Sequence, residues 1–395
     1  MTSPVGMTQS SVRSSNLALV LGCILHRDGQ LSRADIAAQL GMTRSTVSRL
    51  VDDLITGEVV AELEAISGAR GRPAVPLQIR PGSTLGLGLE INVERLIATV
   101  VDLAGTPLSV VREDLDVTLL APSEAMARLS RLAGAALSEA PSTGRLAGAA
   151  LAFPGLVDRD GRTILRAPNL DHWEGAAPAE LWHLDGRYAD IALRTANDID
   201  CSAITVLREQ PGSSFIYITG EVGIGAAISL DGRLLTGRHG WASELGHVCV
   251  DPRGERCGCG AVGCLETVAG SRAILRRAGH PDFDSLLASL TEGDPRSRAV
   301  VERVAEALGI ALGSALNLLD VTTVNLGGHL GLLEPQLRDP LQRTLGERVL
   351  WAGYSEIEIA VIDEAPLRAA VGAGMAALGG VTQDPAAWIE PNLPH

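Results

Sequence analysis

The sequence predicts an α/β protein that consists of an N-terminal winged helix-turn-helix and a larger, two-lobed body. Two short helices joined by a glycine-containing turn are expected within residues 1–81, and strands alternate with helices over residues 82–395. The charge separates the same two parts. Residues 1–80 hold eight Arg against seven Asp and Glu, so they carry +1 within a net charge of −14. This asymmetry indicates separate domains, of which the first is better suited to nucleic acid.

The length and composition describe a globular protein with more than one core. The chain has 395 residues, of which 46% are hydrophobic and 20% are charged. It shows no signal peptide and no uninterrupted apolar run of about 18 residues, so we expect a cytoplasmic protein without a membrane partner. All 33 basic residues are Arg. The absence of lysine excludes mechanisms that need a Schiff-base or phosphate-loop lysine.

The first domain contains LSRADIAAQLGMTRSTVSRLVDDLITGEVV at residues 31–60, preceded by an amphipathic helix. Ser32 is a favourable N-cap with Asp35 three residues later, and Gly41 is expected to end this helix. Thr43 is expected to cap a second helix. The buried face of that helix would comprise Val47, Leu50, Val51 and Leu54. Two short helices on either side of a tight turn predict a helix-turn-helix.

The second helix carries polar side chains near its N-terminal end, where a recognition helix meets base edges in the major groove. We expect DNA contacts from Arg44, Ser45, Thr46, Ser48 and Arg49. Strands at 59–65 and 74–80 are expected to pair as a wing, and the loop between them presents Arg70 and Arg72 to a phosphate or a narrow minor groove. The alternative is a small protein–protein module. The order of helix pair, polar tip, wing and basic loop favours DNA binding.

The body alternates strands and helices in the pattern of an α/β fold. Strands are expected near 84–91, 96–102, 149–153, 191–196, 214–219, 226–230, 322–326 and 357–362, and helices near 123–140, 202–209, 270–277 and 296–319. Ligands of open α/β folds lie at the carboxyl ends of strands, so Asn169, Asn197 and Asp198 are candidate contacts for a hydroxyl-rich ligand. Local alternatives exist, because Asn169 can hold its own turn and Asp198 or Asp200 can cap a helix.

The stretch GHVCVDPRGERCGCGAVGCLE, residues 246–266, holds one histidine and four of the six cysteines. Its spacing H-x9-C-x-C-x4-C suits a structural zinc ion, which favours four nitrogen or sulfur ligands in a tetrahedron. The expected ligands are His247, Cys257, Cys259 and Cys264, and Cys249 is left without a metal role. A disulfide is disfavoured in a reducing cytoplasm, and a redox pair is disfavoured because C-x-x-C spacing is absent.

The segment ASELGHVCVDPRGERCGCGAVGCLETVAGS, residues 242–271, resembles the signature of the ROK family, named for repressors, unidentified reading frames and sugar kinases. The motifs PGLVD, APNLDHWEG and ND are similar to the sugar-site motifs of that family and occur in its order. With the helix-turn-helix, the whole chain resembles the xylose- and N-acetylglucosamine-type repressors. The resemblance implies an actin-like (ribonuclease H-like) body, with lobe one near 82–196 plus the C-terminal segment and lobe two near 197–372.

The resemblance also implies the roles of individual residues. The side chains that would contact sugar hydroxyls are Asn169, Asn197, Asp198, Glu244, His247 and Glu266. Carboxylates and amides suit this role because each forms several hydrogen bonds at once. One nitrogen of His247 would bind zinc within the loop 247–264 and the other would face the sugar, so that the metal fixes the orientation of the ring.

Two turns separate this chain from the kinases of the family, which use the Asp at position 198 as a base and glycine-rich turns for ATP. The acidic-Gly-Gly-Thr turn of the kinases is replaced by LEINVERL at 89–96, and Glu221 enters the second turn, TGEVGIG at 219–225. Added bulk and negative charge should repel phosphates. NLGGHL at 325–330 keeps the glycine pair found near the nucleotide site of the family. We therefore expect no enzymatic activity and no catalytic residue.

The sequence thus predicts a transcriptional regulator, a repressor of genes for sugar uptake or catabolism. A homodimer or tetramer would present its winged helices to a palindromic operator. A monosaccharide or related sugar would close the cleft and change the affinity for DNA. Two alternatives stay open: an ATP-dependent sugar kinase with a DNA-binding head, and a repressor controlled by a regulatory protein partner.

Overall fold

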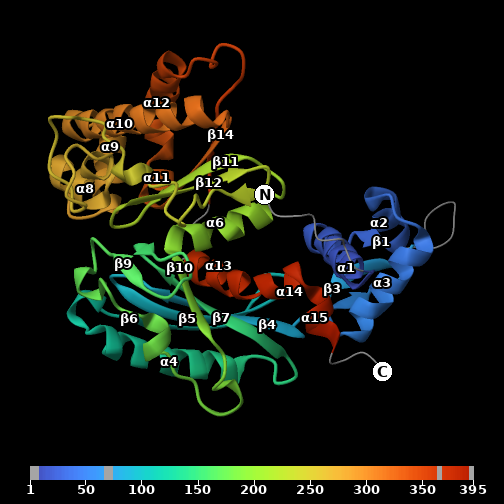
Figure 1. The fold of residues 1–395 in the computed structure, drawn as a ribbon. Helices are drawn as coiled ribbons and strands as arrows, with labels where there is room; N and C mark the ends of the chain where they lie inside the picture. The colour runs from blue at the N-terminus through green and yellow to red at the C-terminus, as the bar shows by residue number, and fades with distance from the viewer. Residues whose placement is uncertain (1–8, 66–73, 363–366, 391–395) are drawn as a thin grey trace, which may run out of the picture. The chain divides into compact units, whose positions relative to one another are not determined.

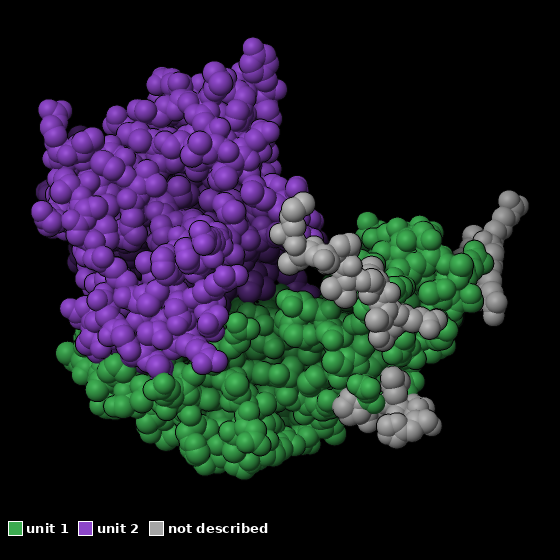
Figure 2. Space-filling model, viewed as in Figure 1, with its two compact units in different colours: residues 1–153, 178–196, 370–395 green, residues 154–177, 197–369 purple. Residues whose placement is uncertain are grey.

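The computed structural model describes residues 9–65, 74–362 and 367–390 of the chain. The chain divides into two compact units (Figure 2). Unit 1 comprises residues 1–153, 178–196 and 370–395, and unit 2 comprises residues 154–177 and 197–369. Each unit is therefore assembled from separate stretches of sequence. Within the described ranges, no helix has both the length and the apolar character needed to span a membrane.

The helix-turn-helix at the start of unit 1 is built as the sequence predicts. Its elements are α1 (Gln9–His26), β1 (Leu31–Ser32), α2 (Arg33–Leu40), α3 (Arg44–Thr56), β2 (Val60–Glu62) and β3 (Pro76–Ile79). Ser32 and Asp35 form a reciprocal capping box, and Gly41 ends α2 with φ of 65°. The Thr43 side chain caps α3. Strand β3 lies between β1 and β2, so the expected wing is present.

The first five-stranded sheet also belongs to unit 1 and has the strand order β10-β7-β4-β5-β6 (Figure 1). Its strands are β4 (Thr84–Ile91), β5 (Arg95–Asp102), β6 (Pro107–Asp114), β7 (Arg145–Phe153) and β10 (Leu193–Asn197). Helix α4 (Pro122–Glu139) packs on β5 and β6. Helix α13 (Arg368–Ala377) lies directly on β4, because a Cβ on Gly88 would overlap the carbonyl of Ala370. Glycine at this position therefore permits the close approach of helix and strand.

The C-terminal helices connect the helix-turn-helix to the first sheet. Helices α14 (Gly379–Gln383) and α15 (Pro385–Ile389) contact α1, and α15 also contacts α3. Ile389 is fully buried, and a Cβ on Gly57, just after α3, would overlap its side chain. The hydroxyl of Ser14 donates a hydrogen bond to Asp384 at 2.6 Å. One continuous hydrophobic core results, and its members include Leu17, Leu54, Val101, Leu378 and Val381.

Unit 2 is built on a second five-stranded sheet with the order β13-β12-β11-β14-β15. Its strands are β11 (Phe215–Gly220), β12 (Ile224–Leu230), β13 (Arg233–Leu234), β14 (Thr323–Gly327) and β15 (Glu358–Val361). Its helices are α6 (Asp198–Glu209), α7 (Glu266–Ala269), α8 (Ser271–Ala278), α9 (Phe283–Glu292), α10 (Pro295–Leu319), α11 (Gly328–Leu332) and α12 (Glu334–Arg348). Strand β11 pairs antiparallel with β12 and parallel with β14.

Helices cover both faces of this second sheet. Ile216 and Ile218 of β11 belong to the large core that also contains Leu308 of α10 and Leu341 of α12. The alternate residues of the same strand, Phe215 and Tyr217, pack instead in a core with Ala203 and Val206 of α6. Because successive side chains of a strand point to opposite faces, α6 lies on one side of the sheet and α10 and α12 lie on the other.

Residues 154–177 belong to unit 2, whereas the sequence placed them in lobe one. They form β8 (Leu156–Val157), β9 (Ile164–Arg166) and the 3-10 helix η2 (Asp171–Trp173). The carbonyl of Val157 accepts a hydrogen bond from the indole of Trp241 at 2.8 Å, and Arg166 donates to the carbonyl of Cys259 at 2.7 Å. These bonds to distant segments have no counterpart in a linear sequence pattern, which explains the difference.

All eight strands expected in the body are present, as are the four expected helices. Helix α6 begins earlier than the sequence predicted, at Asp198. The sequence did not predict α9, α12 and the three C-terminal helices α13, α14 and α15.

Candidate functional site

A cluster of polar side chains lies around the N-terminal end of β12 in unit 2. It draws on four segments: the loop before η2, the N-terminus of α6, the turn that contains the 3-10 helix η4 (Leu245–His247), and the first residue of α7. We name as the polar cluster the side chains of Asn169, Asp200, Glu244, His247 and Glu266, together with Asn197 and Asp198 at the start of α6.

Backbone contacts with β12 bring these segments together. Glu266 accepts a hydrogen bond from the backbone N–H of Ile224 at 3.2 Å. A Cβ on Gly223 would overlap the Glu266 carboxylate and would lie 3.9 Å from Nδ2 of Asn169. A Cβ on Gly225 would overlap Ile199 of α6. These two glycines belong to the segment TGEVGIG that resembles the second phosphate turn of the kinases, and here they make room for Glu266 and Ile199.

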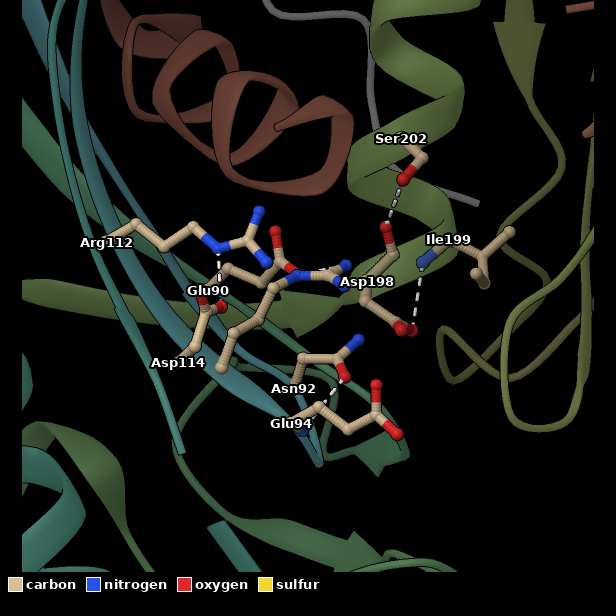
Figure 3. Close-up of polar contacts among 9 residues, drawn as sticks. Glu90, Asn92, Glu94, Arg112, Asp114, Asp198, Ile199 and Ser202 are labelled. Atoms are coloured by element: carbon tan, nitrogen blue, oxygen red, sulfur yellow. Dashed lines mark hydrogen bonds and ion pairs between the residues drawn. The ribbon is translucent and has the colours of Figure 1, made fainter. Parts of the chain in front are cut away.

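Asn197 holds the start of α6. Its Oδ1 accepts hydrogen bonds from the backbone N–H groups of Ile199 at 2.8 Å and Asp200 at 3.1 Å, and its Nδ2 donates to the carbonyl of Gly155 at 3.2 Å. Asn197 is thus the N-cap, a role that the sequence offered as the local alternative for Asp198 or Asp200. Asp198 lies in the first turn, and its Oδ1 accepts from Ile199 at 3.0 Å (Figure 3). The helix N-terminus favours its negative charge.

Asp200 is a member of the polar cluster that the sequence did not identify. Burial raises the pKa of Asp200 to about 6, and the charge of Glu244 adds to this rise. Burial by neighbouring atoms also raises the pKa of Glu244, although part of this residue is exposed. The charge of Glu266 adds to this rise, and that of His247 opposes it. The signal was present as a second Asp in TANDID, but it was interpreted only as a helix cap.

The four expected metal ligands converge in the structure. One donor atom from each lies within 4.8 Å of all the others, in His247, Cys257, Cys259 and Cys264. Cys257 Sγ is 3.8 Å from His247 Nδ1, and Cys259 Sγ is 3.6 Å from Cys264 Sγ. Gly260 adopts φ of 94°, which a side chain would disfavour, and so lets the loop fold back. Three thiols and one imidazole at this separation fit a tetrahedral metal site.

The metal ligands and the polar cluster are in direct contact. Glu266 accepts a hydrogen bond from Cys257 Sγ at 3.5 Å through one oxygen and holds Ile224 through the other. His247 belongs to both groups, and its backbone N–H donates to the carbonyl of Glu244 at 3.1 Å. Cys249 is exposed and lies outside the ligand set. The loop that can hold a metal therefore also positions two carboxylates of the polar cluster.

The candidate DNA surface lies on α3 in unit 1. Arg44, Ser45 and Arg49 are exposed there, and Thr46 and Ser48 are half-buried. The hydroxyls of Ser45 and Thr46 lie 3.0 and 2.8 Å from that of Thr43, so they share in the cap. Arg33, by contrast, pairs with Asp52 and Glu62 and braces α3 against the wing. Arg70 and Arg72 lie outside the described residues.

Comparison with known proteins decides the family. A model of the ROK family matches residues 87–379, and a model of the IclR helix-turn-helix domain matches residues 15–63. This chain belongs to the ROK family. The xylose repressor of Caldicellulosiruptor bescii is 25% identical over 376 residues, which cover 89% of this chain and 92% of the relative. The family resemblance inferred from the cysteine-rich segment is thereby confirmed.

Solved ROK structures share the fold. A ROK family transcriptional regulator, a homologue of the E. coli MLC protein, matches with a TM-score of 0.76 and 23% identity, over 96% of this chain and 99% of that chain. A ROK family glucokinase from Streptomyces griseus, solved with glucose and AMPPNP, matches with a TM-score of 0.61 and 23% identity, over 75% of this chain and 100% of that chain. The predicted actin-like body with a helix-turn-helix is therefore present.

The turn that replaces the first phosphate turn of ROK kinases is closed upon itself in unit 1. The backbone N–H of Asn92 donates to the carbonyl of Arg95 at 3.0 Å, and Oδ1 of Asn92 accepts from the N–H of Glu94 at 3.3 Å (Figure 3). The buried Glu90 carboxylate pairs with Arg95 at 2.8 Å. Two backbone donors of the turn are thus already used, and the Arg95 guanidinium beside the turn is engaged by Glu90.

The counterpart of the second phosphate turn, TGEVGIG at 219–225 in unit 2, is obstructed by a side chain. The imidazole of His329 lies against Gly220, where even a Cβ would overlap it. The ring is buried, its Nε2 lies 2.7 Å from the carbonyl of Ala269, and it stacks on Phe283 with centroids 5.0 Å apart. Burial lowers the pKa of His329 and so favours the neutral ring. A neutral, immobilised ring offers no charge that attracts a phosphate.

Proposed function

We propose that this ROK protein is a transcriptional regulator that binds operator DNA through α3 and the wing and responds to a sugar held by the polar cluster. The observation that carries the proposal is one chain that combines an intact helix-turn-helix with a ROK body in which one turn is closed by its own hydrogen bonds and the other is obstructed by the ring of His329. The match to a xylose repressor along 89% of the chain supports a repressor of genes for sugar uptake or catabolism.

On the DNA side, Arg44 and Arg49 supply the recognition. Both are exposed on α3, and neither forms an ion pair in the part of the chain that the structure describes. A guanidinium can bind guanine through two hydrogen bonds in the major groove, and it can also bind phosphate. A homodimer or tetramer would place two such helices on successive turns of a palindromic operator.

On the sugar side, the carboxylates of Asp200 and Glu244 supply unused acceptors. Neither side chain has a hydrogen-bond donor among the described residues, and each has a raised pKa. Sugar hydroxyls can donate to both, and Asn169, which is exposed and likewise lacks a partner, can donate and accept. Asp200 is half-buried, and a half-buried acceptor without a donor is costly, so a ligand that donates to Asp200 gains affinity.

We assign zinc to the site formed by His247 and the three cysteines, because three thiolates and one imidazole are a common structural zinc set. The ion would supply a cross-link that fixes the loop, and it is expected to have no catalytic part. As a zinc-bound thiolate, Cys257 would have no proton to donate to Glu266. The N–H of Ile224, which donates to Glu266, and the N–H of His247, which donates to the carbonyl of Glu244, would then hold the two residues in position for the sugar.

Contacts within unit 2 lead from the polar cluster to Arg368, and contacts within unit 1 lead from the rest of α13 to the DNA-binding head. Helix α6 starts at the polar cluster with Asp198 and Asp200. Toward the other end of this helix, Arg368 donates hydrogen bonds to Glu209 at 2.8 Å and to Thr205 at 2.5 Å. Arg368 begins α13, which packs on β4 and leads to α14 and α15. Helix α15 contacts α1 and α3. Sugar binding at α6 can therefore shift the equilibrium of the head through this path.

Operator titrations test the proposal. Random DNA is selected with the full-length, zinc-loaded protein, and the selected operator is titrated by fluorescence anisotropy with and without D-xylose, D-glucose and N-acetyl-D-glucosamine. We expect one sugar to change the operator affinity by roughly 5- to 150-fold. Arg49→Ala should weaken operator binding, whereas Arg112→Ala, on β6 of the body, should not.

Two results would contradict the proposal. Selection of no operator would remove the DNA-binding function. Phosphorylation of any of these sugars by ATP in a coupled assay would show that the closed turns still admit a nucleotide, in favour of a kinase with a DNA-binding head. If an operator is selected but no sugar changes its affinity, a regulatory protein partner takes the place of the sugar.

A further inference from the structure

An exposed aromatic pair lies on the same loop as Glu244. The rings of His239 and Trp241 stack with centroids 4.9 Å apart and an interplanar angle of 26°. Trp241 is 42% exposed, and it is the only one of the five tryptophans that ranks among the exposed large hydrophobic residues. The chain contains only three Phe and three Tyr besides. Because the two rings stack on each other, they form a joint aromatic surface and not a single scattered ring, and such a surface can bind a ligand.

The indole of Trp241 is fixed in place although its face is open. Its N–H donates to the carbonyl of Val157 at 2.8 Å, so its polar atom is already satisfied. The loop is closed at its base, where the N–H of Ala242 donates to Thr236 and the hydroxyl of Ser243 donates to Leu235, both at 3.3 Å. The ring therefore presents a preorganised apolar face, and binding to it costs little side-chain entropy.

Trp241 is attached at two points, its own loop and the carbonyl of Val157, and both lie close in sequence to residues that form or hold the polar cluster. Along the loop, Glu244 follows Trp241 by three residues. Across the chain, Val157 lies two residues after Gly155, whose carbonyl accepts from Asn197. At about 3.3 Å per residue, even an extended chain separates the carbonyls of Gly155 and Val157 by no more than roughly 7 Å. The carbonyl that anchors Trp241 therefore lies within about the width of one sugar ring of the carbonyl that anchors Asn197.

We propose that Trp241 and His239 form an outer subsite that binds a second sugar ring, so that the preferred effector is a disaccharide or glycoside and not a free monosaccharide. The first ring would lie in the polar cluster, where carboxylates and amides take its hydroxyls. The second ring would place its C–H face on the indole, which excludes water from apolar surface and suits the negative face of the aromatic ring. This inference rests on the proposed function.

Calorimetry with matched sugars tests the subsite. The probes are D-xylose and xylobiose, D-glucose and cellobiose, and N-acetyl-D-glucosamine and diacetylchitobiose, titrated into the full-length, zinc-loaded protein. We expect at least one disaccharide to bind about tenfold more tightly than its monosaccharide. Trp241→Ala should remove that advantage and leave the affinity for the monosaccharide unchanged. Trp241→Phe, which keeps a ring, should retain part of it.

A control and three further outcomes complete the experiment. Tyr354→Ala removes another exposed aromatic ring of unit 2, on the loop between α12 and β15, and should leave all affinities unchanged. Equal affinity of the wild type for monosaccharide and disaccharide would overturn the subsite. An equal loss of affinity for both sugars in Trp241→Ala would also overturn it, because the residue would then support only the inner site. Binding of no probe at all would contradict the proposed sugar response itself, and with it the subsite.

Discussion

The recognition helix and the polar cluster are held in place by contacts of different range. Helix α3 is capped by Thr43, follows the turn at Gly41 and buries Val47, Leu50, Val51 and Leu54, all within one short stretch. The polar cluster takes its residues from positions 169 to 266 and places them only when α6, η4 and α7 have all packed around β12. Local contacts thus determine the geometry of the DNA surface, whereas long-range contacts determine that of the sugar site.

The largest expected effect comes from breaking the long-range cross-link at the metal loop. Cys257→Ser removes a ligand whose sulfur lies 3.5 Å from the Glu266 carboxylate. We expect it to abolish bound zinc and to destabilise unit 2 by about 4 kcal/mol or more, since metal binding contributes directly to folding free energy. Metal analysis and calorimetry of the purified protein measure both quantities.

Cys249→Ser is the matched control, because this cysteine is exposed in the same loop but outside the ligand set. It should retain one zinc ion and the stability of the wild type. Full zinc content in Cys257→Ser, or its loss in Cys249→Ser, would show that the four ligands are wrongly assigned.

The same difference in range explains how much the sequence could predict. The caps, the ends and the buried face of α2 and α3 followed from neighbouring residues, and the metal ligands followed from their spacing. Asp200 could not be distinguished from a helix cap without knowing that Asn197 fills that role. The packing of α15 on α3 was not foreseen, because it joins residues from opposite ends of the chain.

The second prediction concerns that contact between the head and the C-terminus. In Gly57→Ala the new methyl group would overlap Ile389, so we expect a loss of about 1–3 kcal/mol in the free energy of unfolding, the usual cost of overpacking. Gly134→Ala, in α4 with open space around it, should instead be neutral or stabilising by up to about 1 kcal/mol. Denaturant unfolding compares the two. Equal stabilities would mean that α15 does not pack on α3.

The third prediction uses the raised pKa of Asp200. Since its pKa of about 6 in the folded protein lies above the ordinary value of 3.8, the wild type gains stability from this group at low pH and loses it as the pH rises through 6. Asn cannot titrate, so Asp200→Asn should become more stable than the wild type above pH 6, by about 1–2 kcal/mol.

Unfolding free energies from pH 4 to 8 check this sign. The advantage of Asp200→Asn over the wild type should grow between pH 4 and 6 and then level off. Asp282 provides the opposite case, because hydrogen bonds from Ser285 lower its pKa. Asp282→Asn should therefore lose stability relative to the wild type as the pH rises. An advantage of Asp200→Asn that falls with pH would contradict the burial of Asp200 beside Glu244.

The smallest expected effect tests the path between the two regions. Arg368→Ala removes the hydrogen bonds from α13 to Thr205 and Glu209. We expect operator affinity without sugar to stay unchanged and the effect of the sugar on it to fall by about 0.5–2 kcal/mol. Arg338→Ala, which removes an ion pair with Glu334 on α12, is the control and should keep the full response. Equal responses in both variants would exclude Arg368 from the path.

The most direct test of the account measures sugar affinity twice by calorimetry, once with the free protein and once with the protein saturated by its operator. Linkage requires that the factor by which the sugar changes operator affinity equal the factor by which the operator changes sugar affinity. The account predicts equal factors of roughly 5- to 150-fold. An identical sugar affinity with and without operator would show that the polar cluster and the DNA-binding head act independently, and would contradict the account.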